Sequence, residues 1–462
     1  YLCGFEVAYM KQVCALAGYE IEAYKFDWDG LMMAVPSGKV DCAISMIVPT
    51  DDRRQTMSFT APYYYADTVA VVRRDGPFAQ ADSVEDLRGA RATSMLNTLW
   101  YSVQIDRIPD VNKRPAMESV PTLVVALQSD KVDVILLDRP TAEGVIAANA
   151  DLVIAPMEGT GNFNASRDET AVAIGVGLSD LELLTDLNRA ISQIPQAELE
   201  QMIDDACAYQ PLEQSGDVST LSFFEMVRLL IGRYGPVFLE GAGVAAFLAV
   251  FGTLLGTVIG CTTGAFSSIP VSSESPAWKR WLLRAVRGIV ALYVWLFRGT
   301  PMMVQAMVIY YGAAQLLGWD MDPLWAGLFI VSINTGAYMS ETMRGGIQSV
   351  DAGQDEGAEA IGMGRGQTMF LVILPQAFRS IIPQVGNYLI SNIKDTSMLS
   401  VITVGELFYR GREAAGQYFR FFEVFLIVSC IYLFMTTVAT LLLRLVEKKL
   451  SGPKNYDMCD NR

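Results

Sequence analysis

The second half of the chain contains long apolar segments that lack a polar face at helical spacing. A helix that crosses a bilayer needs about 20 mostly apolar residues, and a stretch such as FLIVSCIYLFMTTVATLLL offers none of the polar positions of an amphipathic soluble helix. The segments that meet this requirement are Val237–Ile259, Gly288–Leu317, Leu324–Met343, Met369–Ile393 and Phe421–Val446. This pattern predicts an all-α membrane domain of five transmembrane helices.

The first half alternates amphipathic stretches with short β-branched runs, which is typical of an α/β fold. The runs KVDCAISMIV (39–48) and KVDVILLD (131–138) each follow a helical stretch. The segments that contain them, LMMAVPSGKVDCAIS and LVVALQSDKVDVILL, resemble each other, which indicates two lobes with mostly parallel sheets. Ligands of such folds bind at the carboxyl ends of strands and between lobes. We therefore expect a bilobed domain with its ligand site near Ser45–Arg53 and Asp138.

Charge separates the two halves of the chain. Residues 1–217 contain 33 acidic and 16 basic residues, whereas the remainder contains 17 and 19, so the net charges are −17 and +2. The first part is thus typical of a soluble acidic domain. The second part is typical of a domain whose solvent is the lipid bilayer. Neither part has the basic footprint of a nucleic-acid-binding protein.

The positions of basic residues predict the orientation in the cell membrane. Basic residues gather in the connection between the first two segments and after the last one: Lys279, Arg280, Arg284 and Arg287, then Lys448, Lys449 and Lys454. Positive flanks favour the cytoplasmic side, so five crossings place the first domain outside and the C-terminus in the cytoplasm. The start YLCGFEVAYM has no features of a signal peptide, so we expect that an N-terminal part is missing.

The cysteine and histidine content argues against zinc sites and against histidine-based catalysis. The chain has no histidine, and its 7 cysteines show no CxxC spacing. In an exported domain Cys3 and Cys14 are compatible with a disulfide, and equally with unpaired buried thiols.

A series of motifs covers residues 1 to about 212. They are GFEVAYMKQVCALAG, FDWDGLMMAVPSGKVDCAIS, DDRRQTMSFTAPYYY, SVEDLRGARAT and ALQSDKVDVILLD. In order and spacing they resemble the periplasmic-type amino-acid-binding proteins of ABC importers. Only the first strand of that family, which would precede GFEVAYM, is missing.

This resemblance implies roles for individual residues. Arg53 matches the arginine that clamps the ligand α-carboxylate, a task suited to a bidentate guanidinium. Asp138 matches the carboxylate that holds the α-ammonium group, Trp28 the aromatic wall, and Thr98 a hydroxyl from the second lobe. The full implied binding set is Trp28, Ser45, Met46, Val48, Arg53, Asn97, Thr98 and Asp138.

Two positions depart from the family pattern. Met46 stands where the family usually has glycine, and Val48 where it usually has a serine or threonine. One interpretation is a narrower, drier pocket that prefers small or apolar-chained amino acids over Gln, Glu or His. The other is that this site has weakened.

A second series of motifs covers the membrane part, about 237–446. FRGTPMMVQAMVIYYG, GAYMSETMRGGIQSVDAGQ, EGAEAIGMGRGQTMFLVILPQA and NIKDTSMLSVITVGELF resemble the permease subunits of polar-amino-acid ABC importers. The cytoplasmic signature of that family is EAA, three residues, glycine, then nine residues to I-x-LP. The matching positions are Glu356, Ala358, Gly362, Ile373, Leu374 and Pro375, with Gly357 in place of the first alanine.

The resemblance implies that this loop docks in a groove of a partner ATPase. A short helix, a glycine turn and a second helix opened by Pro375 would form a compact polar knob outside the bilayer. No segment fits GxxxxGK[ST], so we expect no ATPase and no cofactor in this chain, with ATP bound by a separate subunit.

Polar residues inside the apolar segments are candidates for a translocation pathway, because they would be costly facing lipid. They are Arg298 in the second segment and Arg379, Gln384, Asn387, Ser391 and Asn392 in the fourth. Roughly half of such residues hold helices together by hydrogen bonds instead.

Together these features predict a fused importer subunit that takes up an amino acid and works as a homodimer or heterodimer of permeases. The expected domains are a binding domain (1–212), a linker (213–236), a permease domain (237–450) and a cytoplasmic tail (451–462). The rival interpretations are a ligand-gated channel or an amino-acid sensor with a glutamate-receptor-like binding domain. In such channels pore helices interrupt the binder, whereas here both lobes finish before Val237.

Overall fold

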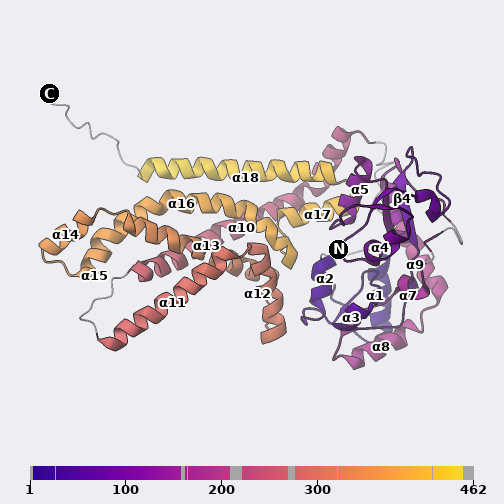
Figure 1. Ribbon diagram of the computed structural model, residues 1–462, viewed down its shortest axis with the longest axis horizontal. Helices are drawn as coiled ribbons and strands as arrows, with labels where there is room; N and C mark the ends of the chain where they lie inside the picture. Colours follow the sequence, from indigo (N-terminus) through magenta and orange to yellow (C-terminus); the bar gives the residue numbers. More distant parts are fainter. Residues whose placement is uncertain are drawn as a thin grey trace. The chain divides into compact units, whose positions relative to one another are not determined.

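The computed structural model describes residues 4–26, 28–157, 162–163, 165–208, 221–268, 276–319, 321–418 and 420–450. Apart from short segments, its contacts divide the chain into two compact units, the first ending at Gly235 and the second beginning at Pro236 (Figure 1). The expected tail and Cys3, with its possible disulfide to Cys14, lie outside the described residues. Residues 209–222 connect the last helix of the binding part to the first long helix of the membrane part.

Lobe one of the first unit is built from the beginning and the end of its sequence. Its elements are α1 (Phe5–Ala17), α2 (Trp28–Ala34), β1 (Cys42–Ala43), α3 (Asp51–Arg54), β2 (Met57–Phe59), β3 (Tyr64–Tyr65), β9 (Ala171–Val172), β10 (Gly175–Gly177), α8 (Leu181–Ile191) and α9 (Gln196–Ala208). Strands β1, β10 and β2 form an antiparallel sheet in that order, and β3 pairs with β9. Helix α1 packs against α8 and α9 through a core that includes Val13, Leu187 and Leu199.

Lobe two is a five-stranded sheet in the order β6-β5-β7-β4-β8 with helices around it. Its elements are β4 (Thr68–Arg73), a 3-10 helix η1 (Val84–Leu87), β5 (Arg91–Thr93), α4 (Leu99–Ser102), a 3-10 helix η2 (Gln104–Arg107), β6 (Asn112–Lys113), α5 (Val120–Gln128), β7 (Val134–Asp138), α6 (Arg139–Ala148), β8 (Leu152–Ile154) and α7 (Arg167–Thr170). Two buried apolar clusters cover its faces, one with Leu87 and Ile105, the other with Leu123 and Leu127. The bilobed α/β prediction is confirmed.

The expectation of mostly parallel sheets is wrong for lobe one and for β4. Strand β5 is parallel to β6 and β7, but β4 is antiparallel to both β7 and β8. The reason is that β4 carries the chain into lobe two and is inserted between strands that run the other way. The expected strand 39–48 is also shorter, because only Cys42–Ala43 pairs in a sheet and the following residues form a loop.

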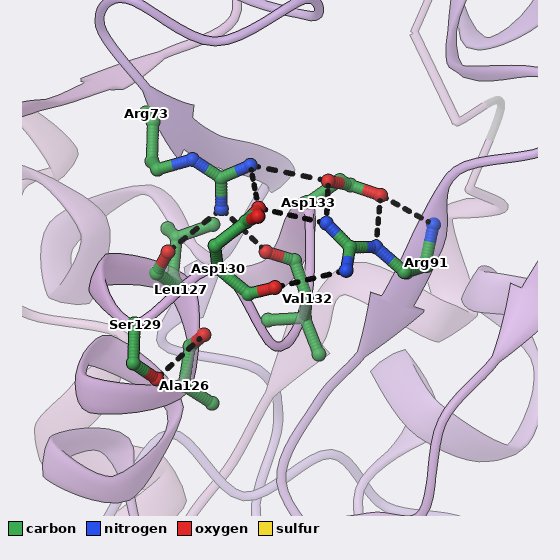
Figure 2. A network of polar contacts seen from close by, with 8 residues as sticks. All are labelled: Arg73, Arg91, Ala126, Leu127, Ser129, Asp130, Val132 and Asp133. Atoms are coloured by element: carbon green, nitrogen blue, oxygen red, sulfur yellow. Dashed lines mark hydrogen bonds and ion pairs between the residues drawn. The ribbon is translucent and has the colours of Figure 1, made fainter.

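An ion-pair network fastens the turn before β7 to β4 and β5 (Figure 2). Arg91 Nε donates to Asp133 Oδ2 at 2.9 Å, and Arg91 Nη2 lies 2.7 Å from both Asp133 Oδ1 and Asp130 Oδ1. On the other side, Arg73 Nη1 donates to the carbonyl oxygen of Val132 at 2.6 Å. The Lys-Val-Asp sequence noted above therefore has a structural role in this lobe.

Replacing Asp133 with asparagine is expected to destabilise lobe two at neutral pH. The hydrogen bond from Arg91 is the main cause that lowers the pKa of Asp133 to about 2. A carboxylate whose folded-state pKa is lowered stabilises the fold above its unfolded pKa of about 3.9, and the stabilisation disappears as the pH falls toward 2. With solvent screening taken into account, Asp133→Asn should cost about 1–2 kcal/mol at pH 7 and much less near pH 2.

Thermal unfolding of the full chain in detergent, followed by tryptophan fluorescence at both pH values, measures this effect. Asp130→Asn is the matched control, because the Asp130 side chain is 69% exposed and that of Asp133 only 12%. Equal destabilisation by the two variants at neutral pH would contradict the assignment.

The second unit consists of helices and their connections in its described residues. They are α10 (Phe223–Ser268), which begins in the first unit, α11 (Ala277–Gly299), α12 (Met302–Leu317), α13 (Pro323–Gln348), α14 (Ala352–Ala360), α15 (Arg365–Thr368), a π-helical turn (Met369–Ile373), α16 (Leu374–Asp395), a 3-10 helix η6 (Thr396–Ile402), α17 (Leu407–Tyr418) and α18 (Phe421–Leu450). The end of α12 from Ala314, α17 from Gly411 and α18 up to Ile427 are grouped by their contacts with the first unit. Within the described residues, Phe223–Ser268, Arg365–Ile402 and Phe421–Lys449 are long and apolar enough to cross a membrane. The helical membrane domain is confirmed, and the number of five crossings stays a prediction.

The second expected segment, Gly288–Leu317, is not a single helix. Helix α11 ends at Gly299 and α12 begins at Met302 in a different direction (Figure 1). The break falls at Thr300 and Pro301, because proline lacks an N–H group and disfavours helical geometry at the preceding residue. A continuous span over this segment is therefore a wrong prediction.

Four glycines spaced four residues apart allow α10 and α13 to approach closely. A Cβ atom added at any of them would lie within 3.0 Å of α13 atoms. The glycines are Gly252, Gly256, Gly260 and Gly264, and their contacts include, in order, Val331, Thr335, Met339 and Met343. The residue numbers of the contacting positions increase together along α10 and α13, so the two helices run parallel. They pack through small residues, as is common in membranes.

Replacing Gly260 with leucine is expected to push α10 away from α13 and to lower the melting temperature of the membrane unit. Overpacking a close helix contact costs about 1–3 kcal/mol. The measurement is thermal stability of the full chain in detergent by size-exclusion chromatography after heating. Gly243→Leu on the same helix is the control, because a Cβ there would meet nothing within 4 Å. Equal melting temperatures of Gly260→Leu and Gly243→Leu would contradict the close packing of α10 on α13.

Candidate functional site

Arg53 lies at the centre of the expected ligand site and joins the two lobes. It belongs to α3, a short helix whose N-cap is Thr50. Its Nη1 donates to the carbonyl oxygen of Val48 at 2.8 Å, and its Nη2 donates to that of Asn97 at 2.9 Å. The guanidinium carbon lies 5.3 Å from the ring centroid of Trp28. The structure thus brings Arg53, Val48, Asn97 and Trp28 together around one cationic group.

Burial lowers the pKa of Arg53 from its ordinary value. An arginine stays protonated in proteins even so, and its charge is partly removed from water. Its current acceptors are two uncharged carbonyl oxygens, which bind a guanidinium less strongly than a carboxylate does. The site therefore favours an added anionic group.

Thr98 and Asp138 supply the second lobe's share of the site. Thr98 is buried at the start of α4, and its hydroxyl donates to the carbonyl oxygen of Met95 at 2.6 Å. Asp138 ends β7, is 2% exposed, and accepts a hydrogen bond from the Thr141 N–H at 2.8 Å as the N-cap of α6. Burial raises the pKa of Asp138, so a nearby ammonium group would favour its ionised form.

The loop after β1 contains Ser45, Met46 and Val48, all half-buried. Met46 has a φ of 47°, in the left-handed region. Its N–H donates to Oε1 of Glu6 on α1 at 2.7 Å, and the Tyr63 hydroxyl donates to the same oxygen at 2.5 Å. Sequence reasoning missed Glu6, which is 40 residues from Met46 in the chain. The sequence offered one indirect signal, a methionine where the family has glycine, the residue suited to positive φ, and this signal does not identify the group that supports residue 46.

The expected cytoplasmic knob forms a compact turn between α14 and α15. Gly362 is left-handed, with φ 85°, and its N–H donates to the carbonyl oxygen of Glu359 at 2.9 Å. The Met363 N–H donates to that of Ala358 at 3.0 Å, and Arg365 Nε lies 3.8 Å from Glu359 Oε1. These contacts close the turn and fix the directions of both helices.

The remaining knob residues show that its second half is longer than expected. Glu356 is exposed, Ala358 and Leu374 are buried, and Ile373 is half-buried. Pro375 does not open the second helix, because helical structure already begins at Arg365 and continues through a π-helical turn into α16. Gly364 acts as the N-cap instead, with its N–H donating to Gln367 Oε1 at 2.9 Å.

Two cavities lie among the helices of the membrane unit. The smaller, about 300 Å³, has polar lining residues that include Thr300, Asn334, Ser391, Asn392 and Asp395. The larger, about 650 Å³, is lined by residues that include Arg287, Trp295, Arg298, Glu341 and Arg344. Tyr338 lines both.

The candidate pathway residues divide between these surroundings. Arg298 Nη1 lies 3.8 Å from Glu341 Oε2 in the larger cavity. Asn392 is buried and donates to the hydroxyl oxygens of Thr253 at 2.8 Å and Thr335 at 3.0 Å. Its amide therefore ties three helices together beside the smaller cavity, which Ser391 also lines.

The other three candidates lie elsewhere on α16. Arg379 and Asn387 are exposed in the single chain, and Gln384 is half-buried. Asn387 Nδ2 lies 3.5 Å from Gln384 Oε1. The structure thus separates these three from the residues that line the smaller cavity.

Comparison with known families gives two matches in series. Residues 2–206 match the bacterial extracellular solute-binding proteins, family 3, and residues 273–452 match the binding-protein-dependent transport system inner membrane component. The arginine transport system permease protein ArtQ of Bacillus subtilis (strain 168) is 33% identical over 218 residues, which cover 47% of this chain and 94% of ArtQ. The chain belongs to the binding-protein-dependent inner membrane transport components.

One further relative and one solved structure are also similar to this chain. The glutamine transport system permease protein GlnP of Escherichia coli (strain K12) is 34% identical over 216 residues, covering 46% of this chain and 93% of GlnP. A crystal structure of an amino acid ABC transporter with histidines is 31% identical, with a TM-score of 0.43, and covers 50% of this chain and 99% of that chain. In this member of the family, a solute-binding domain and a permease domain are joined in one chain.

Proposed function

We propose that this chain takes up an amino acid across the cell membrane as the substrate-binding and permease subunit of an ATP-driven ABC importer. The observation that carries the proposal is the fusion, in one chain, of a solute-binding domain with Arg53 in its cleft and a permease domain. The relatives are permeases of arginine and glutamine transport systems. A separate ATPase binds the ATP, and this chain needs no cofactor of its own. The domain limits proposed from the sequence, 1–212 and 237–450, are compatible with the matched ranges.

The first step is ligand capture between the lobes. The α-carboxylate of the amino acid replaces the carbonyl oxygens of Val48 or Asn97 on the Arg53 guanidinium, because a charged acceptor forms the stronger hydrogen bond. The α-ammonium group pairs with Asp138, which ends a strand of lobe two. The Trp28 ring, stacked on Arg53, bounds the side-chain pocket. Since the two charged ends of the ligand meet different lobes, binding stabilises their closed arrangement.

The second step is passage through the membrane unit. The smaller cavity has room for one amino acid at about 300 Å³, and Asp395 offers a counter-charge to its ammonium group. The larger cavity presents arginines with Glu341 as their acidic partner. Tyr338, which lines both cavities and stacks at 5.6 Å on the Arg298 guanidinium, lies where a gate between them would act.

The third step is coupling to the ATPase through the knob formed by α14 and α15. Its exposed acidic side chains, Asp355, Glu356 and Glu359, are available to a groove on the partner.

Two membrane domains form one pathway, so we propose a homodimer that carries two receptors. The binding domain lies outside the cell and the C-terminus in the cytoplasm. The channel and sensor interpretations are not retained, because both family matches belong to import systems.

Uptake in reconstituted vesicles tests the function. The full chain is reconstituted with the ATPase subunit of an amino-acid ABC importer, and uptake of each of the twenty labelled amino acids is followed with and without ATP. We expect ATP-dependent accumulation of one amino acid or a narrow group. The ligand that is accumulated should also raise the melting temperature of the chain by mass action. Uptake that runs equally without ATP would point to a channel and contradict the proposal.

A further inference from the structure

Glu6 and Tyr63 hold the backbone of Met46 in a conformation that methionine rarely adopts. Both the Met46 N–H and the Tyr63 hydroxyl donate to Glu6 Oε1, at 2.7 and 2.5 Å. The Tyr63 ring is 4% exposed, and its centroid lies 5.2 Å from that of Tyr9 on α1. The Tyr63 N–H also donates to the carbonyl oxygen of Val172 at 3.0 Å. The acceptor for Met46 is therefore anchored in the core of lobe one.

The residue after Met46 cannot move to relieve the left-handed conformation. Ile47 is fully buried, and its carbonyl oxygen accepts a hydrogen bond from the Ala173 N–H at 2.9 Å. Val48 follows and presents its carbonyl oxygen to Arg53 at 2.8 Å. Any relaxation of Met46 must therefore be absorbed by Ser45, on the side that leads to β1. Such a change would displace the loop that meets the ligand.

We propose that Glu6, supported by Tyr63, is a positioning residue for ligand binding, which selects the left-handed conformer at residue 46 and so preorganises the Ser45–Val48 loop. The inference rests on the proposed binding of an amino acid in this cleft. For a residue with a side chain, the left-handed conformer is less populated by about 5- to 30-fold. Glycine populates positive φ freely and needs no such support. The hydrogen bonds that the Met46 N–H and the Tyr63 hydroxyl donate to Glu6 are called the clamp below. The clamp therefore offsets the free-energy cost of a left-handed conformation at methionine.

A direct contact between Glu6 and the ligand ammonium group is the competing role. Asp138 of lobe two is close enough to raise the pKa of Glu6, although burial is the larger cause. The two roles differ in what they need from residue 6. Positioning needs an acceptor oxygen, which glutamine retains, whereas an ammonium contact needs the negative charge.

The test combines binding and hydrogen exchange on the full chain in lipid nanodiscs. The variants are Glu6→Gln, Glu6→Ala, Tyr63→Phe, Met46→Gly and the double variant Glu6→Ala/Met46→Gly. Binding is measured by calorimetry with L-arginine, L-glutamine and L-alanine as probes. Deuterium exchange of the peptide that contains Met46 reports the clamp itself, with or without a ligand.

Glu6→Ala should weaken binding about tenfold, as expected for loss of the left-handed conformer, and should speed exchange at Met46. Glu6→Gln should keep binding within about threefold, because its amide oxygen still accepts from the Met46 N–H. Tyr63→Phe should lie between the two. Met46→Gly should restore most of the affinity in the Glu6→Ala background, since glycine adopts positive φ without the clamp.

Two results would overturn the inference. One is unchanged exchange at Met46 in Glu6→Ala, even where that variant binds weakly. The other is a loss of affinity in Glu6→Gln as large as in Glu6→Ala, without rescue by Met46→Gly, which would assign Glu6 to the ligand charge. Absence of binding by the wild type counts against the proposed function instead, and the exchange experiment still decides whether the clamp exists.

Discussion

Replacing Gly362 with arginine is expected to reduce amino-acid uptake to background while ligand binding stays unchanged. Gly362 has φ 85°, and an arginine there is strained by about 1–2 kcal/mol. Relief of that strain changes the angle between α14 and α15, and the long side chain adds bulk on the surface that we propose meets the ATPase. Stimulation of ATP turnover by the amino acid should disappear with uptake, because the proposed mechanism couples the binding domain to the ATPase through this knob.

The measurement is reconstitution with the cognate ATPase, with binding, uptake and ATP turnover followed in parallel. Gly362→Asn is the matched control, since asparagine tolerates the left-handed region better than other residues with side chains. It should retain part of the uptake. Both variants should still enter the membrane, because the change lies outside the apolar helices. Normal uptake by the arginine variant would mean that the knob does not couple the two proteins.

Replacing Arg53 with alanine is expected to weaken amino-acid binding by about 100- to 1000-fold. The truncation removes the proposed charged partner of the α-carboxylate and would leave that carboxylate partly buried, a cost of about 3–4 kcal/mol. In the ligand-free chain the truncation also removes the hydrogen bonds that Arg53 donates to the carbonyl oxygens of Val48 and Asn97. The loss of the carboxylate contact is therefore the main effect expected on binding.

Calorimetry on the full chain in detergent measures this loss. Arg54→Ala is a close control, because Arg54 is the exposed neighbour, with its guanidinium 5.8 Å from the Phe59 ring centroid. Its affinity should stay within about twofold of wild type, as for a surface charge. Arg53→Lys should fall between the two, since lysine keeps the charge but not the bidentate geometry. Unchanged affinity in Arg53→Ala would remove the carboxylate role.

Sequence reasoning predicted the elements whose evidence is local. Helices α10 and α18 were recognisable because their apolar runs have no polar face, and strand β7 because KVDVILLD is short, apolar and β-branched. The break at Thr300–Pro301 was missed because apolar residues continue on both sides of it. The proline itself was the available signal, and its effect on the preceding residue outweighed the hydropathy.

Contacts between distant residues were beyond local reasoning. Arg53 was predicted because the motif that contains it resembles a motif of the amino-acid-binding proteins. The structure adds that Arg53 contacts Asn97, 44 residues away. Glu6 could not be found in this way, because nothing in GFEVAYM indicates that its glutamate meets the Met46 N–H. The reversed strand β4 was missed for a similar reason, since strand direction depends on where the chain crosses between lobes.

The connection of α9 to α10 through residues 209–222 has a consequence for the energetics of docking. Two domains of one polypeptide meet intramolecularly, so their encounter does not depend on the concentration of a separately diffusing binding protein. In the proposed import cycle, productive docking therefore needs less affinity between the two domains than it would between separate proteins. The number of receptors per permease is also fixed at synthesis, so it does not depend on expression level.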